Sequence, residues 1–275
     1  MNEAWLDPFN AQMYEAYAQK YPMYREIGKK LVEAANIQQG MTIVDLACGT
    51  GIVTTQILTK LNHIGTIIGI DGSPAMLDIA KKKFSDYAVR FLQSSAEDLQ
   101  DVLPAESVDI VVCNSAFWQM RVKETLDGIY SILKPGGKFV FDLPDFGRYS
   151  PQTLQNRFSY QFTRFIVQIA QAEFGYVPAQ RPRRSGYSTD ARPLEEIRSS
   201  LEQSSLALIS YDQTVSIERT AQDLYEFQKI PVMSLRYLPG LDYATRTQIV
   251  ETAYQRFDLL HNDIVTWRYY VGEKG

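Results

Sequence analysis

Between residues 40 and 145, short apolar runs alternate with segments whose apolar positions recur at helical spacing. Residues 42–47 are typical of the runs, because Ile43, Val44 and Leu46 are β-prone and show no helical period. Such runs indicate strands that are covered on both faces. The predicted strands are residues 42–47, 65–70, 88–93, 108–113 and 138–142, and the predicted helices between them are residues 52–61, 74–84 and 122–133. This alternation predicts a parallel sheet that binds ligands at the carboxyl ends of its strands.

The chain on either side of this region has a different pattern. Residues 9–35 have mostly helical spacing, and Pro22 starts a second helix or kinks the first. After residue 144 the regular alternation stops. Helices are predicted at residues 151–174, 194–203, 221–229 and 244–260, with a loop at 175–192, an alternating strand within 206–217 and a final strand at 265–271.

We therefore predict an α/β fold, namely a Rossmann-like, seven-stranded, mostly parallel sheet with helices on both faces and a largely helical substrate cap. The 275 residues, 45% of them hydrophobic, can bury a full core, so residues 1–275 are expected to form a single domain. Its expected parts are an N-terminal helical cap (1–39), a ligand-binding core (40–144), cap insertions (145–192 and 218–262) and the C-terminal part of the sheet (193–217 and 263–275).

Charge and cysteine content narrow the class of protein. The net charge of -4 argues against a general nucleic-acid binder, which is usually basic. Cys48 and Cys113 lie in apolar runs and are expected to be buried free thiols in a reducing compartment. Residues 1–10 lack a basic region followed by an apolar one, and no run approaches 18 apolar residues. These features predict a cytoplasmic protein without a membrane partner.

The first predicted strand runs into a glycine turn. Asp45 interrupts its apolar run, and a charge in a buried strand needs a partner. Gly49 and Gly51 let the backbone adopt φ > 0 and bring its N–H groups close to a ligand. The N-terminus of the helix at residues 52–61 faces the same place and favours an anionic group. A plain strand-to-helix turn that contains two glycines is the alternative.

An acidic residue ends the second predicted strand. Asp71 follows Gly51 by 20 residues, lies beside the glycine turn and can accept both hydroxyls of a ribose. NAD enzymes and methyltransferases share this arrangement. The turn lacks the third glycine of G-x-G-x-x-G, which favours a ligand without a pyrophosphate.

Five segments in order resemble the motifs of class I S-adenosylmethionine-dependent methyltransferases, and in particular the ubiquinone/menaquinone methyltransferase-like group that acts on small molecules. They are residues 44–51 (VDLACGTG), 70–77 (IDGSPAML), 95–99 (SAEDL), 109–114 (DIVVCN) and 133–137 (LKPGG). The resemblance covers residues 40–145. It implies an enzyme that uses S-adenosyl-L-methionine as methyl donor and releases S-adenosyl-L-homocysteine, but it does not identify the acceptor.

The resemblance also implies which residues hold the methyl donor. Gly49 and Gly51, with Ala47, would pack against its methionine part, and Asp45 would lie near its ammonium group. Asp71 would hold the ribose hydroxyls.

The remaining implied contacts belong to the adenine and the sulfonium. Met76 or Ala75, next to the turn at Gly72, would lie on one face of the adenine, although Met76 is equally suited to a core position. Ser95, Ala96 and Glu97 would line the adenine edge, and Asn114 would contribute backbone near the sulfonium. The family often has Asp where this chain has Ser95, so the contact to the exocyclic amine would pass to Glu97 or to Asp98, which equally suits a turn cap.

The reaction itself requires little from the protein. A sulfonium methyl group is already activated, so catalysis mainly requires a nucleophile held at roughly 3 Å with water excluded. A base is required only when the acceptor must lose a proton. His261 and Tyr17 are the candidate catalytic residues, and His63 is expected to be structural. Candidate acceptor-pocket residues are Tyr14, Tyr21 and Trp118, although tyrosines at helical spacing are more often packing residues. No metal site is assigned.

Residues 145–192 have an unusual charge. They contain seven arginines, three acids and no lysine, for a net +4. Arginine suits carboxylate or phosphate, so the segment could hold an acidic substrate or the phosphopantetheine arm of a carrier protein. A solvated loop without a partner is the alternative. Aromatic residues in the segment favour a lid over an apolar acceptor.

The predicted function is methyl transfer to a small aromatic or apolar metabolite, as in natural-product or quinone biosynthesis, with oxygen or nitrogen favoured over carbon as the acceptor atom. One alternative is a macromolecular methyltransferase. Residues 114–117 (NSAF) lack the Asn-Pro-Pro-aromatic motif of DNA base methylation, and the acidic total also disfavours nucleic acid. The other alternative is a non-catalytic S-adenosylmethionine-binding subunit. The oligomeric state stays open.

Overall fold

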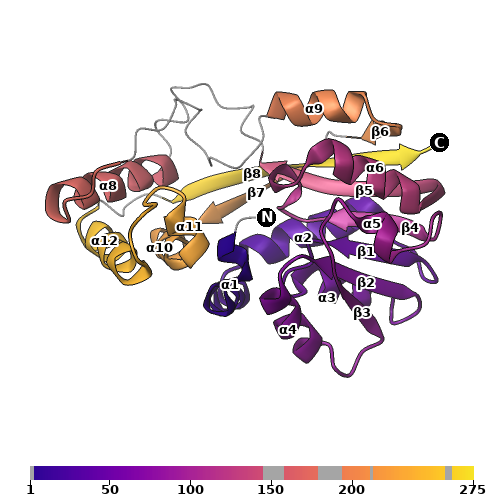
Figure 1. Ribbon diagram of the computed structural model, residues 1–275, viewed down its shortest axis with the longest axis horizontal. Coiled ribbons are helices and arrows are strands. Elements are labelled where there is room, and N and C mark those ends of the chain that lie inside the picture. Colours follow the sequence, from indigo (N-terminus) through magenta and orange to yellow (C-terminus); the bar gives the residue numbers. More distant parts are fainter. Residues whose placement is uncertain (1–2, 145–157, 179–193, 211–212, 258–261) are drawn as a thin grey trace.

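The computed structural model describes residues 3–144, 158–178, 194–210, 213–257 and 262–275. Within these residues an eight-stranded sheet with the order β3-β2-β1-β4-β5-β8-β6 forms the centre, and β7 also pairs with β8 (Figure 1). The strands are β1 (Thr42–Leu46), β2 (Thr66–Asp71), β3 (Val89–Gln93), β4 (Val108–Cys113), β5 (Leu133–Pro144), β6 (Leu206–Ser210), β7 (Thr214–Arg219) and β8 (Asp263–Lys274). Strands β1 to β5 pair in parallel, and β8 is antiparallel to β5, β6 and β7. The prediction of a mostly parallel sheet is therefore confirmed.

The sheet has eight strands instead of seven because the strand predicted within residues 206–217 is two strands. The 12-residue β8 is long enough to pair with both. β6 pairs with its second part, from Leu206 opposite Lys274, and β7 pairs with its first part, up to Arg219 opposite Asp263.

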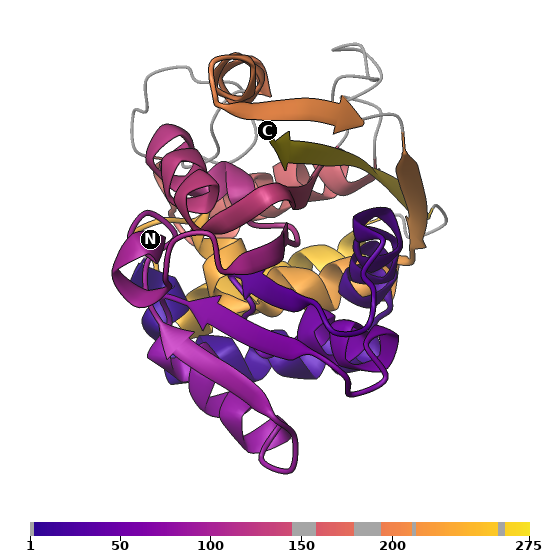
Figure 2. The ribbon, with the colours of Figure 1, turned by 90° about the vertical axis from the view of Figure 1, so that its right-hand side faces the viewer.

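Helices cover both faces of the sheet (Figure 2). On one face α2 (Met23–Ala35) and α3 (Ile52–Lys60) share a core with Ile43 of β1, and on the other α6 (Val122–Ile132) and α9 (Leu194–Glu202) share a core with Val44 and Leu46. Successive residues of β1 thus meet different apolar layers, which explains why Ile43, Val44 and Leu46 are apolar without an alternating pattern. The helices α4 (Pro74–Lys83) and α5 (Leu99–Val102) pack beside β3 and α6, respectively.

The remaining helices form a cap with its own core. They are α8 (Phe158–Glu173), α10 (Ala221–Lys229), α11 (Pro231–Leu235) and α12 (Tyr243–Arg256). Phe162, Ile166, Leu224 and Ile249 are buried together between them. Because β7 runs in the direction of β1 to β5 and leads directly into α10, the cap lies beyond the carboxyl ends of the parallel strands (Figure 1).

The N-terminal segment lies between the cap and the sheet. The 3-10 helix η1 (Glu3–Leu6) and α1 (Pro8–Lys20) contact α4 on one side and α11 on the other, and α1 also contacts α10. The segment therefore covers the edge of the sheet at which ligands of this fold bind. Among the described helices, none has the length and apolar character that a membrane span requires.

Candidate functional site

The carboxylate of Asp71 lies at the end of β2, beside the glycine turn that follows β1. Its Oδ2 accepts the Gly49 N–H at 2.9 Å, and its Oδ1 accepts the Ser73 N–H at 2.8 Å. Burial raises the pKa of this carboxyl group, and the two backbone bonds oppose that shift. Each carboxylate oxygen can accept a further hydrogen bond, so the group can still take two hydroxyl donors.

The two glycines of the turn have different structural roles. Both have positive φ, 53° at Gly49 and 85° at Gly51. A Cβ at Gly51 would lie 2.4 Å from Cε2 of Phe84, so the turn packs directly on the end of α4. A Cβ at Gly49 would meet only the Tyr14 ring, at 3.9 Å, which leaves space above the turn. No described side chain caps the N-terminus of α3, whose N–H groups face this space.

Asp45 has a hydroxyl as its partner. The residue is buried at 1% exposure, and Oγ1 of Thr54 donates to its Oδ2 at 2.6 Å. Burial raises the pKa of Asp45 to about 7. The partner that a buried carboxylate requires thus comes from α3.

The residues predicted for the adenine side lie in the loop after β2, in the first turn of α4 and in the loop after β3. The Met76 N–H bonds to Oγ of Ser73, which caps α4, and the Met76 side chain is buried at 3% exposure with Ala75 and Ala11. In the loop after β3, the Ser95 hydroxyl donates to Asp98, and Glu97 accepts the N–H of Arg121. The half-buried Gly72 and Ala96 belong to the same two loops, and Ala47 lies in the first turn with a φ of 56°.

Helix α1 places Tyr14 above the glycine turn. The half-buried Tyr14 ring packs against Trp5 and Tyr24, with centroid distances of 5.9 and 5.1 Å. Oγ of Ser73 donates to the backbone oxygen of Trp5 at 2.7 Å, and the Trp5 indole donates to Gln119 at 3.3 Å. The N-terminal segment is thereby fixed to the loops after both β2 and β4.

Tyr17, one of the two predicted catalytic residues, belongs to a buried charged cluster. Its hydroxyl donates to Asp223 of α10 at 2.5 Å, and Arg219 donates to Asp223 at 3.0 Å and to the Tyr17 oxygen at 3.3 Å. Burial raises the pKa of Tyr17 far above its ordinary value. The cluster therefore ties α1 to the cap. The Tyr21 ring stacks on Tyr17 at 5.1 Å, and its buried hydroxyl has no partner among the described residues.

A further group of polar atoms lies where β4, β5 and β8 meet. Asp142, near the end of β5, is fully buried, and its Oδ1 accepts the N–H and the hydroxyl of Ser115 at 2.9 and 3.2 Å. Within the described residues, Oδ2 of Asp142, Oδ1 of Asn114 and Nε1 of Trp267 have no hydrogen-bond partner. The predicted acceptor residue Trp118 packs against Trp267, with centroids 5.5 Å apart.

Sequence reasoning had not selected Asp142 as a site residue. The signal was present, because a charged residue inside the run FVFDL of β5 needs a partner as Asp45 does in β1.

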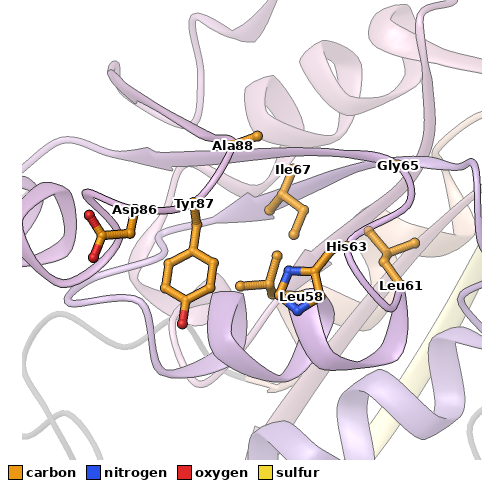
Figure 3. A pocket seen from close by; sticks show the side chains of 8 residues that line it. All are labelled: Leu58, Leu61, His63, Gly65, Ile67, Asp86, Tyr87 and Ala88. Atoms are coloured by element: carbon orange, nitrogen blue, oxygen red, sulfur yellow. The ribbon is translucent and has the colours of Figure 1, made fainter.

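Other predicted residues lie elsewhere. His261 is outside the described residues, as are all arginines of the 145–192 segment except the exposed Arg164. His63 lies between α3 and β2, at the opposite edge of the sheet, where it stacks on Tyr87 with a centroid distance of 5.9 Å. These two rings line a cavity of about 110 Å³ (Figure 3). Its volume is below the usual range of small-molecule sites, roughly 300–1,000 Å³.

Comparisons with known proteins show which family residues 43–137 resemble. Residues 43–137 match the family model described as "Methyltransferase domain". An uncharacterised methyltransferase-like protein of Schizosaccharomyces pombe is 35% identical over 125 residues, 46% of this chain and 46% of that protein. A malonyl-[acyl-carrier protein] O-methyltransferase of Paenibacillus sp. is 30% identical over 125 residues, 43% of this chain and 45% of the enzyme.

The chain thus spans about half the length of the curated relatives it matches. A solved structure, the YcgJ protein from Bacillus subtilis, covers 90% of this chain and 98% of its own, with a TM-score of 0.57 at 15% identity. This likeness supports the Rossmann-like fold. The matched residues 43–137 include the glycine turn, Asp71, and the polar residues Asn114 and Ser115 that follow β4.

Proposed function

We propose that this chain, whose residues 43–137 form a class I S-adenosylmethionine-dependent methyltransferase domain, transfers the methyl group of that cofactor to a small acceptor. The observation that carries the proposal is the carboxylate of Asp71, which two backbone N–H groups hold beside the open space above Gly49.

The described residues fit the methyl donor. The Asp71 carboxylate retains two acceptor positions, which matches the two hydroxyls of a ribose. A Cβ at Gly49 would project into the space above the turn, so glycine leaves room for the backbone to contact a ligand. The buried Asp45 lies on the same face of the sheet and suits a cationic ammonium group nearby. These residues, together with the loops after β2 and β3, would hold the cofactor.

The bound cofactor supplies a methyl group on a positively charged sulfur, and its transfer to an O–H or N–H acceptor breaks a C–S bond, forms a C–O or C–N bond and leaves one proton to be taken up. The described residues provide enclosure and positioning. Tyr14 lies beside the glycine turn with Trp5 packed on its ring, and the Tyr17 cluster fixes α1 to the cap, so the N-terminal segment encloses the carboxyl edge and limits the access of water. The catalytic roles of Tyr17 and His261 stay predictions.

We infer that the acceptor is an aromatic or apolar small molecule that binds between this edge and the cap, as in small-molecule biosynthesis in the cytoplasm. The half-buried Trp118 and the buried Trp267 offer an aromatic surface there, and Tyr21 offers a hydroxyl that has no partner among the described residues. The resemblance to a malonyl-[acyl-carrier protein] O-methyltransferase supports an acidic or carrier-bound acceptor as the second candidate.

The test is methyl transfer from radiolabelled S-adenosylmethionine to two acceptor panels, one of hydroxylated and aminated aromatics and one of free and carrier-bound carboxylic acids. Labelled product from the first panel, lost in Asp71→Ala, is the expected result. Labelled product from the second panel alone would show that the acceptor is acidic and would contradict an apolar acceptor. Binding of S-adenosylhomocysteine without turnover on any acceptor would instead favour a non-catalytic subunit.

A further inference from the structure

The corner formed by β4, β5 and β8 contains three side chains that each have a buried polar atom without a hydrogen-bond partner among the described residues. Asn114 follows β4, Asp142 is near the end of β5, and Trp267 lies on β8. Asp142 pairs with Tyr269 across the sheet, and Trp267 lies two residues from Tyr269 on the same face. Buried polar atoms are rarely left unpaired, so three of them in one corner indicate that a polar ligand binds there.

The position of this corner relates it to the methyl-transfer site. In the sheet order β2-β1-β4-β5-β8, Asp71 and the glycine turn lie at β2 and β1. The cap helices α10 to α12 lie in the chain between β7 and β8, whose paired ends Arg219 and Asp263 are at the carboxyl edge. The strand register places Asp142 on the same face of the sheet as Asp45, Asp71 and Val140. This face carries the core that packs beneath α2 and α3. The carboxyl group therefore lies between the ribose end of the site and the cap, which is where an acceptor must meet the methyl group.

We propose that Asp142 is a catalytic residue of this protein and that its Oδ2 accepts the proton from an acceptor that presents an O–H or N–H group. This inference rests on the proposed methyl transfer. As the new C–O or C–N bond forms, the acceptor proton moves to Oδ2 and the carboxylate becomes a neutral carboxyl group. The positive charge on the donor sulfur disappears in the same reaction, so the buried site changes from one opposite-charge pair to two neutral groups.

The environment of Asp142 suits this role. Burial raises the pKa of Asp142 to about 8, and the two bonds from Ser115 oppose the shift. The titratable groups that face it are Cys113 on β4, Tyr24 on α2 and Tyr269 on β8, and burial raises the pKa of each of these groups, so all three are neutral near pH 7. A cation at the site therefore favours the ionised carboxylate, and loss of that cation favours its protonation.

The test uses binding alone and exploits the charge difference between S-adenosylmethionine and the neutral S-adenosylhomocysteine. Both are titrated calorimetrically into the wild-type protein and into Asp142→Asn between pH 6 and 9. Asn keeps an oxygen that can accept both Ser115 bonds, and it replaces the charge and the Oδ2 acceptor with a neutral NH2 group. In the wild type, the ratio of the two affinities should rise in favour of S-adenosylmethionine by about tenfold or more with pH. In Asp142→Asn the ratio should stay flat.

Asp45→Asn is the matched control, because Asp45 is also a buried carboxyl group on the same face of the sheet. It should weaken both ligands in parallel, since both carry the ammonium group, and leave the pH dependence of their ratio in place. If the affinity ratio depends on pH in Asp142→Asn as it does in the wild type, the proposed role of Asp142 is wrong. The proposed methyl transfer would not be affected by that result. Absence of binding of either ligand to the wild type would contradict the proposed function itself.

Discussion

Replacement of Asp71 by Ala removes the group on which the cofactor assignment depends. In the free protein it leaves the N–H groups of Gly49 and Ser73 without their acceptor, and an unsatisfied buried donor costs about 1–3 kcal/mol. In the complex it also removes a charged acceptor from two ribose hydroxyls. Hydrogen bonds to charged groups contribute about 1.5–3 kcal/mol, so affinity should fall by about 10- to 150-fold.

The assay is calorimetric titration with S-adenosylhomocysteine, paired with chemical denaturation. Asp109→Ala is the matched control, because Asp109 also accepts a backbone N–H, that of Thr42 at 2.7 Å, but it lies near the start of β4 and thus at the opposite edge of the sheet. Asp109→Ala should lower the free energy of unfolding and leave cofactor affinity intact. Equal affinities for Asp71→Ala and the wild type would refute the placement of the ribose at β2.

Two further predictions concern the same turn and strand. Gly51→Ala should destabilise the fold by about 2–4 kcal/mol, because it combines an unfavourable positive φ with the Phe84 contact, whereas Gly136→Ala, with a φ of 73° and open space, should lose only about 1–2 kcal/mol in denaturant titrations. Since the folded-state pKa of Asp45 is raised from 3.8 to about 7, the stability that its neutral form contributes is complete below pH 4 and is lost as the pH rises towards 7. The melting temperature of the ligand-free protein should therefore fall over this range, and the fall should be smaller in Asp45→Asn; an identical profile would contradict the buried position of this carboxyl group.

Local patterns in the sequence predicted the sheet and the cofactor edge. Burial on both faces makes Ile43, Val44 and Leu46 of β1 apolar, so the strand, the glycine turn and the spacing to Asp71 could be recognised from local sequence. The division of residues 206–217 into β6 and β7 could not be predicted from local sequence. It depends on the length of β8, which follows more than 40 residues later.

The acceptor side depends on contacts between distant residues. Tyr17 reaches Asp223 across 206 positions of the chain, and no spacing rule indicates that pairing. The helical stripe of α1 therefore predicted tyrosines on one face and could not distinguish a free phenol from one bonded to a carboxylate. Asp142 ends the strand predicted at residues 138–142, and no local pattern shows that Ser115 bonds to one of its oxygens while the other has no partner among the described residues.

The central claim is that the edge formed by Gly49, Gly51 and Asp71 binds S-adenosylmethionine. Calorimetric titration of the wild-type chain with S-adenosylhomocysteine and, separately, with NADH tests it most directly. The account predicts micromolar binding of S-adenosylhomocysteine and no binding of NADH. Binding of NADH without binding of S-adenosylhomocysteine would contradict it.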